Sequence, residues 1–143
     1  MVEVADVRRR LRGGIEEARR RAAARRALVD ETTRAYDAIL ETMAIPIFRT
    51  LAEALTAEAH RFKIETPSGV VRLVRERSSG DHIELALDTQ RDVPAVVLRS
   101  THGRGRRTIA TEQILAEGPQ IADVTDSVLT DAAVQALIPL IER

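Results

Sequence analysis

The pattern of apolar positions changes once along the chain, from a helical period to an alternating one. Upstream of residue 60, apolar side chains recur every three or four positions, which predicts a long N-terminal helical segment over residues 1–60. The clearest part of this helical stripe consists of Tyr36, Leu40, Met43, Ile47, Leu51 and Leu55. Toward the N-terminus the stripe thins to Ile15, Ala18, Ala22 and Val29, and Arg25 interrupts it.

Glycine and proline predict where this helical segment breaks. Two adjacent glycines, Gly13 and Gly14, cost about 2 kcal/mol in a helix interior, so we expect a short arm before them and a long helix after them. Pro46 either kinks one helix or begins a second helix at its first turn. Because Ile45 is a poor N-cap, the kink is favoured.

Residues 61–115 predict a five-stranded antiparallel meander, in which short strands alternate with short turns. In "HIELALD", Ile83, Leu85 and Leu87 point to one face, while Glu84 and Asp88 point to the other. The segment "AVVLRST" is apolar enough for a strand buried on both faces. The other expected strands are "RFKIE", "VVRLVRE" and "RTIATEQIL", and the expected turns are "TPSG", "RSSGD" and "HGRGR".

Residues 128–142 predict a C-terminal helix packed on the sheet. Thr130 is the expected N-cap and Asp131 the first-turn acid. One side of this helix carries Val134, Leu137, Ile138 and Ile141. Helices segregated from an antiparallel sheet define the α+β class, so the chain is expected to form one α+β domain over residues 1–143.

Three stretches resemble a set of uncharacterised bacterial single-domain proteins with the same order of elements. These stretches are "IPIFRTLAEALTAEAHRFKIETPSGVVRL", "IELALDT" and "GRGRR". The resemblance covers most of the chain and implies a recurring single domain. It implies no activity, because its motifs are not chemical signatures.

Charge is balanced over the whole chain but not along it. The 22 basic and 22 acidic residues cancel, so no global field attracts nucleic acid or membrane. Residues 1–34 carry ten Arg and six acids, which gives a net charge of +4 and leaves −4 on the remainder. Such asymmetry favours self-association or a polyanionic partner. Codon usage in a GC-rich genome also explains 21 Arg beside a single lysine, Lys63.

The absence of cysteine excludes disulfides, thiolate catalysis and cysteine-ligated zinc. No apolar run approaches the ~20 residues of a membrane span, and the start of the chain lacks the apolar core of a signal peptide. We therefore expect a cytoplasmic protein with no membrane partner.

Two basic clusters are candidates for anion binding. The stretch from Arg8 to Arg26 has nine arginines against two glutamates, which is typical either of a solvated helix or of a nucleic-acid-binding arm. The second cluster surrounds two glycines that would let a loop approach a phosphate closely. Its candidate anion-binding residues are His102, Arg104, Arg106 and Arg107. The alternative is a hairpin tip with solvated arginines.

No catalytic, cofactor or metal motif is present. His60, His82 and His102 lack the i, i+4 spacing of a metal-binding helix. The three aromatic residues, Tyr36, Phe48 and Phe62, are too few for base stacking and are expected in the core or in a helix interface.

Three classes of function therefore stay open. The first is a non-enzymatic association or scaffold protein, homodimeric through the long helix, whose association residues would be Tyr36, Leu40, Met43, Ile47, Leu51 and Leu55. The alternative is a nucleic-acid or polyanion binder that uses the Arg-rich N-terminus and the loop at residues 104–107. The third is a small enzyme or ligand carrier with a pocket between sheet and helix.

Overall fold

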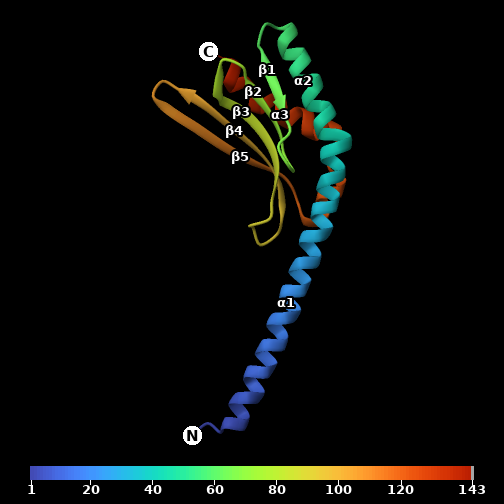
Figure 1. Ribbon diagram of the computed structural model, residues 1–143, viewed down its shortest axis with the longest axis vertical. Helices are drawn as coiled ribbons and strands as arrows, with labels where there is room; N and C mark the ends of the chain where they lie inside the picture. The colour runs from blue at the N-terminus through green and yellow to red at the C-terminus, as the bar shows by residue number, and fades with distance from the viewer. Residues whose placement is uncertain (143) are drawn as a thin grey trace.

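The computed structural model describes residues 1–142, the side chain of Ser79 excepted, and confirms the α+β layout. Helix α1 spans Val4–Ile39, a π-helical turn η1 spans Leu40–Ala44, and helix α2 spans Ile45–Ala57. The three elements follow one another without a gap and form one long rod (Figure 1). The lower part of the rod extends well beyond the rest of the molecule.

The expected break at Gly13–Gly14 is wrong, because α1 continues through both glycines. A Cβ atom at either position would meet no other atom within 4 Å, so neither glycine serves a close contact. The surrounding residues are mostly Ala, Arg and Glu, which are strong helix formers. Glu17 also pairs with Arg20 and Arg21 on the helix surface. The helical preference of the neighbours exceeds the cost of the two glycines.

Pro46 is accommodated by the π-helical turn that precedes it. The N–H group of Ile45 donates to the carbonyl of Leu40, five residues back. In a regular α-helix the proline ring would collide with the carbonyl four residues earlier. The wider turn relieves this collision, so the rod neither ends nor restarts at Pro46.

The five strands form one antiparallel sheet in the order β1-β2-β3-β4-β5, as the sequence predicts. Their bounds are β1 Phe62–Glu65, β2 Val71–Arg75, β3 Ser78–Asp88, β4 Ala95–Arg104 and β5 Arg107–Glu117. The turn expected at "RSSGD" is wrong, because strand β3 already begins at Ser78 and the turn consists of Glu76 and Arg77. The pairing shifts between Val74 and Arg75, and this bulge lets the chain reverse earlier.

The C-terminal helix begins earlier than the sequence suggests. After a 3-10 helix η2 at Gly118–Asp123, helix α3 spans Asp126–Ile141. Its N-cap is Thr125, whose hydroxyl accepts from the Val128 N–H at 3.3 Å, so the expected cap at Thr130 is wrong. The predicted buried face is only partly correct, because Val134 and Ile138 are exposed. The residues that α3 buries are Leu129, Ala132, Ala133, Leu137 and Leu140.

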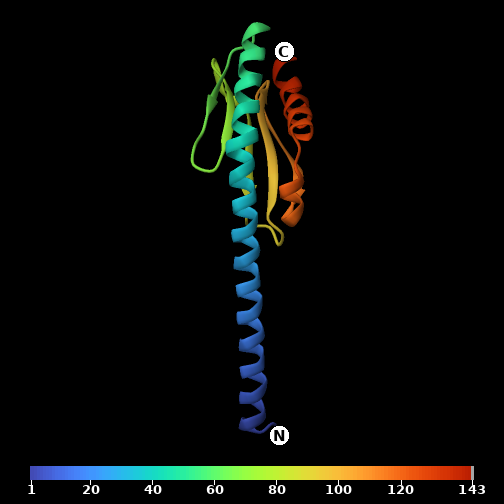
Figure 2. The same cartoon turned by 90° about the vertical axis from the view of Figure 1, so that its right-hand side faces the viewer.

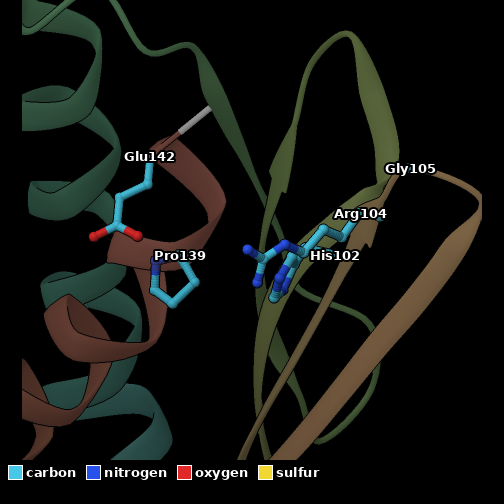
Figure 3. A pocket seen from close by; sticks show the side chains of 6 residues that line it. His102, Arg104, Gly105, Pro139 and Glu142 are labelled. Carbon is cyan, nitrogen blue, oxygen red and sulfur yellow. The ribbon is translucent and has the colours of Figure 1, made fainter.

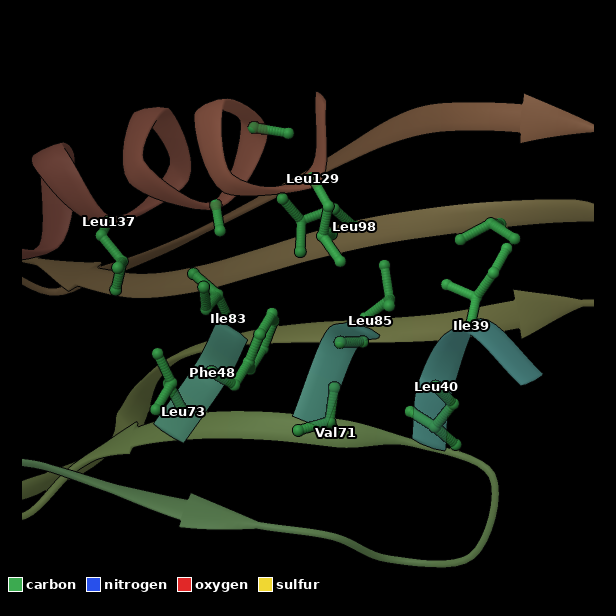
Figure 4. Packing of buried hydrophobic residues seen from close by; sticks show 14 of the residues in the cluster. Ile39, Leu40, Phe48, Val71, Leu73, Ile83, Leu85, Leu98, Leu129 and Leu137 are labelled. Carbon is green, nitrogen blue, oxygen red and sulfur yellow. The ribbon is translucent and has the colours of Figure 1, made fainter. Parts of the chain in front are cut away.

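The rod and helix α3 lie side by side over one face of the sheet (Figure 2). The main core fills the space between these layers (Figure 4). Ile83 and Leu85 of β3 are fully buried in it, which confirms the predicted inward face of that strand. All three aromatic side chains are buried as well, as expected. Strand β4 is buried on both faces from Ala95 to Leu98.

Candidate functional site

The predicted anion-binding residues lie near the turn between β4 and β5, but the structure brings only two of them together. His102 and Arg104 line a hollow of about 230 Å³ between the end of β4 and the end of α3 (Figure 3). The other lining residues are Gly103, Gly105, Pro139 and Glu142. Arg106 and Arg107 are exposed at the turn and do not line this hollow.

The charges around this hollow are mixed. Glu142 places a carboxylate on the side opposite Arg104 (Figure 3), and the last turn of α3 adds the partial negative charge of its carbonyls. An anion there would meet repulsion as well as attraction. The site therefore lacks the uniform positive charge that the sequence suggested for a phosphate.

A buried acid and a cation tie this end of the sheet to α3. Asp81 is 1% exposed and accepts the N–H of Gly103 at 2.9 Å. Arg75 lies 3.8 Å from Asp81 and donates to the backbone carbonyl of Leu140, the last buried residue of α3. This arrangement joins β2, β3, β4 and α3, so its role is structural. Sequence reasoning missed it, because the register shift between β2 and β3 that places Arg75 here leaves no signal in the pattern.

Ion pairs occupy the open face of the sheet. Arg72 bridges Glu84 at 3.0 Å and Glu65 at 3.7 Å, while Arg99 binds Glu112 at 2.8 Å. The hydrogen bond from Arg99 holds the pKa of Glu112 below its ordinary value and raises that of Arg99 itself. These side chains flank a small apolar cluster of Ala86, Ala95 and Val97, with Val70 packed against it. The charges of these paired side chains are mutually neutralised.

The apolar stripe that predicted association is used mainly by the protein's own core. Tyr36 and Leu40 are buried at 2% and 7% exposure. The other four stripe residues, Met43, Ile47, Leu51 and Leu55, are half-buried and pack against the same core. This stripe thus leaves little exposed surface for a second molecule. Dimerisation itself stays a prediction.

The exposed apolar surface of the long helix lies further toward the N-terminus. Residues 4–27, here called the arm, extend about 36 Å at 1.5 Å per residue and lie below the sheet in both views (Figures 1 and 2). Four large apolar side chains of the arm are exposed. They are Val4 at 69%, Val7 at 49%, Leu11 at 61% and Ile15 at 44%.

Five apolar residues of the arm share one side, which we call the seam: Val4, Leu11, Ile15, Ala18 and Ala22, with Arg8 at the helical position between Val4 and Leu11. The steps between them are 7, 4, 3 and 4 residues, the spacing of a helix that packs against another helix. Sequence reasoning noticed part of this row but interpreted it as a weak continuation of the stripe. The expected break at Gly13–Gly14 hid its continuity.

Arg25 marks the point where the arm leaves the sheet domain. Its guanidinium donates to the backbone carbonyls of Thr89 at 3.0 Å, Arg91 at 2.6 Å and Asp92 at 2.5 Å, all in the loop before β4. Four residues later Val29 is half-buried, and Thr32 is 1% exposed. Burial of α1 against the domain thus begins within about two turns of Arg25.

The two basic clusters do not form one surface. The arm lies at one end of the molecule, whereas the turn between β4 and β5 lies at the other end of the sheet (Figures 1 and 2). A single polyanion bound to both would have to span the length of the domain. The polyanion hypothesis therefore rests on either cluster separately.

Other classes of site receive no support from residues 1–142. No group of three or more His, Asp or Glu side chains there could hold a metal ion. No helix within this range has the length and apolar character needed to cross a membrane. No protein-family model, curated protein or solved structure matches the chain.

Proposed function

We propose that this protein is a non-enzymatic association protein that uses the arm as its contact element. The observation that carries the proposal is the exposure of Val4, Leu11 and Ile15 along one side of a helix that extends away from its own domain. Burying apolar surface contributes about 25 cal/mol per Å², so this row gains free energy only when another surface covers it.

The arm is already helical before any partner binds, because its C-terminal end continues into the packed part of the rod. An isolated helix in water must first form an unfavourable first turn before it can extend. Here the arm continues a rod whose later turns are packed in the core, from Thr32 onward. The first turn is therefore already formed, and a partner would not have to order the helix.

A homodimer through the long helix is one form of this function. It would use the seam rather than the stripe of Tyr36 to Leu55, because that stripe already packs on the sheet. An acidic partner molecule is the other form. Purified protein at high concentration distinguishes the two forms, because a homodimer assembles without any other molecule and the second form does not.

The test compares the native size of the protein in an extract of the cells that produce it with its size after purification. In the extract we expect the wild type to elute as a complex and the variant Leu11→Asp/Ile15→Asp to elute as a monomer. The control variant Ala24→Asp/Ala27→Asp adds the same two charges on the other side of the arm, where both alanines are exposed, and should elute like the wild type.

Two results would contradict the proposal. One is a wild-type protein that elutes as a monomer both in the extract and after purification. The other is loss of the complex in the control variant as well, since this would show a general effect of charge on the helix. Unchanged thermal unfolding of both variants would confirm that the sheet domain stays folded.

A further inference from the structure

A row of arginines runs along one edge of the seam. Arg12 and Arg19 follow the seam residues Leu11 and Ala18 by one position, and Arg26 follows Arg25 in the same way. The three arginines are spaced by seven residues, or about 10.5 Å along the helix. All three are exposed. In a pair of packed helices, the positions beside the seam are those that select the partner by charge.

The acids of the arm do not neutralise this row. Glu17 binds Arg20 at 3.0 Å and Arg21 at 3.3 Å, and Asp6 lies 3.4 Å from Arg9. Within residues 1–142 the three arginines of the row have no acidic partner, and the same holds for Arg8 and Arg10. The seam is thus bordered by positive charge that is free to pair with another molecule.

A second copy of this chain would not supply the missing acids. In an antiparallel pair of arms, the row would face the row of the other copy. In a parallel pair it would face the opposite border of the seam, which consists of Val7, Gly14, Arg21 and Leu28. Neither border contains Asp or Glu, and like charges at such positions oppose pairing.

We propose that the seam and its arginine row bind an acidic amphipathic helix of another protein. The partner helix carries its own apolar seam, bordered by Glu or Asp at intervals of seven residues. Each guanidinium can then bind a carboxylate through a bidentate pair of hydrogen bonds, a geometry that a lysine ammonium does not offer. This inference rests on the proposed function and names the partner that the arm selects.

Duplex nucleic acid fits the seam less well, although it would neutralise the arginines. Val4, Leu11 and Ile15 lie beside the arginine row and would stay exposed to water next to the phosphates, so no apolar surface would be buried. A partner helix covers both the apolar and the charged parts at once. Nucleic acid is therefore one outcome of the test, and it would overturn the proposal.

The probes are two designed peptides of four heptads with leucine and isoleucine in the seam. One peptide has Glu at every position that borders its seam, and the other has Lys there. Each repels copies of itself, so each is available as a monomer. Binding to the full chain is measured by fluorescence anisotropy at low and high salt. We expect the Glu peptide to bind roughly tenfold more tightly than the Lys peptide, with the difference shrinking at high salt.

Three variants locate the contact. Arg12→Glu/Arg19→Glu/Arg26→Glu should reverse the preference, so that the Lys peptide binds more tightly. Arg9→Glu/Arg10→Glu/Arg20→Glu makes the same change of charge on the other side of the arm and should keep the preference for the Glu peptide. Leu11→Asp/Ile15→Asp should lose both peptides. Circular dichroism of each variant checks that the helix content is retained.

Several results would overturn the inference. These are equal binding of the two peptides, equal loss in the two charge variants, tighter binding of a 20-base-pair DNA duplex than of the Glu peptide, or a wild-type dimer at micromolar concentration by sedimentation. The function itself would survive if the complex in the cell extract still depended on Leu11 and Ile15. Failure of the partner class and failure of the association function are thus distinguishable.

Discussion

The hydroxyl of Tyr36, in helix α1, donates a hydrogen bond to the backbone carbonyl of Leu85, in strand β3, at 3.2 Å. The same hydroxyl lies 2.7 Å from the carbonyl of Gly69, in the turn before β2. Tyr36 is 2% exposed; its contact with Leu85 is buried and its contact with Gly69 is partly buried. They fix the position of the rod along the sheet and thereby the number of turns that remain outside it as the arm.

Removing this hydroxyl should destabilise the domain. We expect Tyr36→Phe to lower the free energy of unfolding by about 1–3 kcal/mol, because the carbonyls of Leu85 and Gly69 lose the one hydroxyl proton that they share, while the ring still fills its space. Urea denaturation of the purified protein measures the change. Thr50→Ala is the control, since the Thr50 hydroxyl bonds only within its own helix at an exposed position. A loss in Tyr36→Phe no larger than in this control would contradict the role of the hydroxyl.

The phenol of Tyr36 should also make stability depend on high pH. Burial, together with the nearby acids Asp37 and Glu84, raises its pKa in the folded protein above its ordinary value of about 10. The folded state then keeps a proton that the unfolded state loses. The free energy of unfolding should be unaffected by this group below about pH 10 and should fall as the pH rises further, by up to about 1.4 kcal/mol per unit.

This pH dependence is measurable because Tyr36 is the single tyrosine of the chain. Denaturation of wild type and Tyr36→Phe at a series of pH values from about 9 to 11 should show the extra slope in the wild type alone. Tyrosinate absorbance should appear together with unfolding rather than before it. Ionisation in the folded protein near the ordinary pKa would show that the phenol is accessible to water.

A cavity on the inward face of β3 should lower the free energy of unfolding strongly. Leu85 is fully buried between the sheet and the helices, so we expect Leu85→Ala to cost about 2–5 kcal/mol of unfolding free energy. Ile114, on the edge strand β5, is 41% exposed, and Ile114→Ala should cost under about 1 kcal/mol. Denaturant midpoints of the two variants compare them directly. Similar midpoints would mean that the packing of β3 is misassigned.

Binding of duplex DNA should be weak and without sequence preference. The chain carries no net charge, and its two basic clusters lie at opposite ends of the domain. Any complex at low salt should weaken steeply as salt is added, because neutralised phosphates release counterions. The variant Arg104→Ala/Arg106→Ala/Arg107→Ala should weaken binding of every sequence by the same factor. Electrophoretic mobility shifts on unrelated duplexes would reveal any preference, which would contradict this expectation.

The type and order of the helices and strands were predictable from local patterns, but the residues at which they begin and end were not. The alternation in "HIELALD" correctly assigned Ile83 and Leu85 to the core, because a strand sends successive side chains to opposite faces. Thr130 was chosen as N-cap by residue type, yet Thr125 caps α3. Both threonines satisfy the local rule, and the choice depends on where α3 must begin in order to place Leu129 in the core.

The candidate site was predictable only in part. The sequence showed the arginines of the N-terminal stretch and the spacing of Ile15, Ala18 and Ala22, but it could not show which turns of the helix the sheet would cover. Likewise, the "GRGRR" loop suggested an anion site, and only the packed structure places Glu142 across from Arg104. Contacts between distant segments are set by the summed packing of the core, which no local pattern contains.

The sequence by itself determined the order of helix, five strands and helix, because hydrophobic period and turn residues act over a few positions. Tertiary structure alone decided that the stripe beginning at Tyr36 is internal and that the seam from Val4 to Ala22 is external. Both rows have the same helical spacing and differ only in what lies beside them. The sheet is long enough to cover one row and not the other, so its reach along the rod separates core from contact surface.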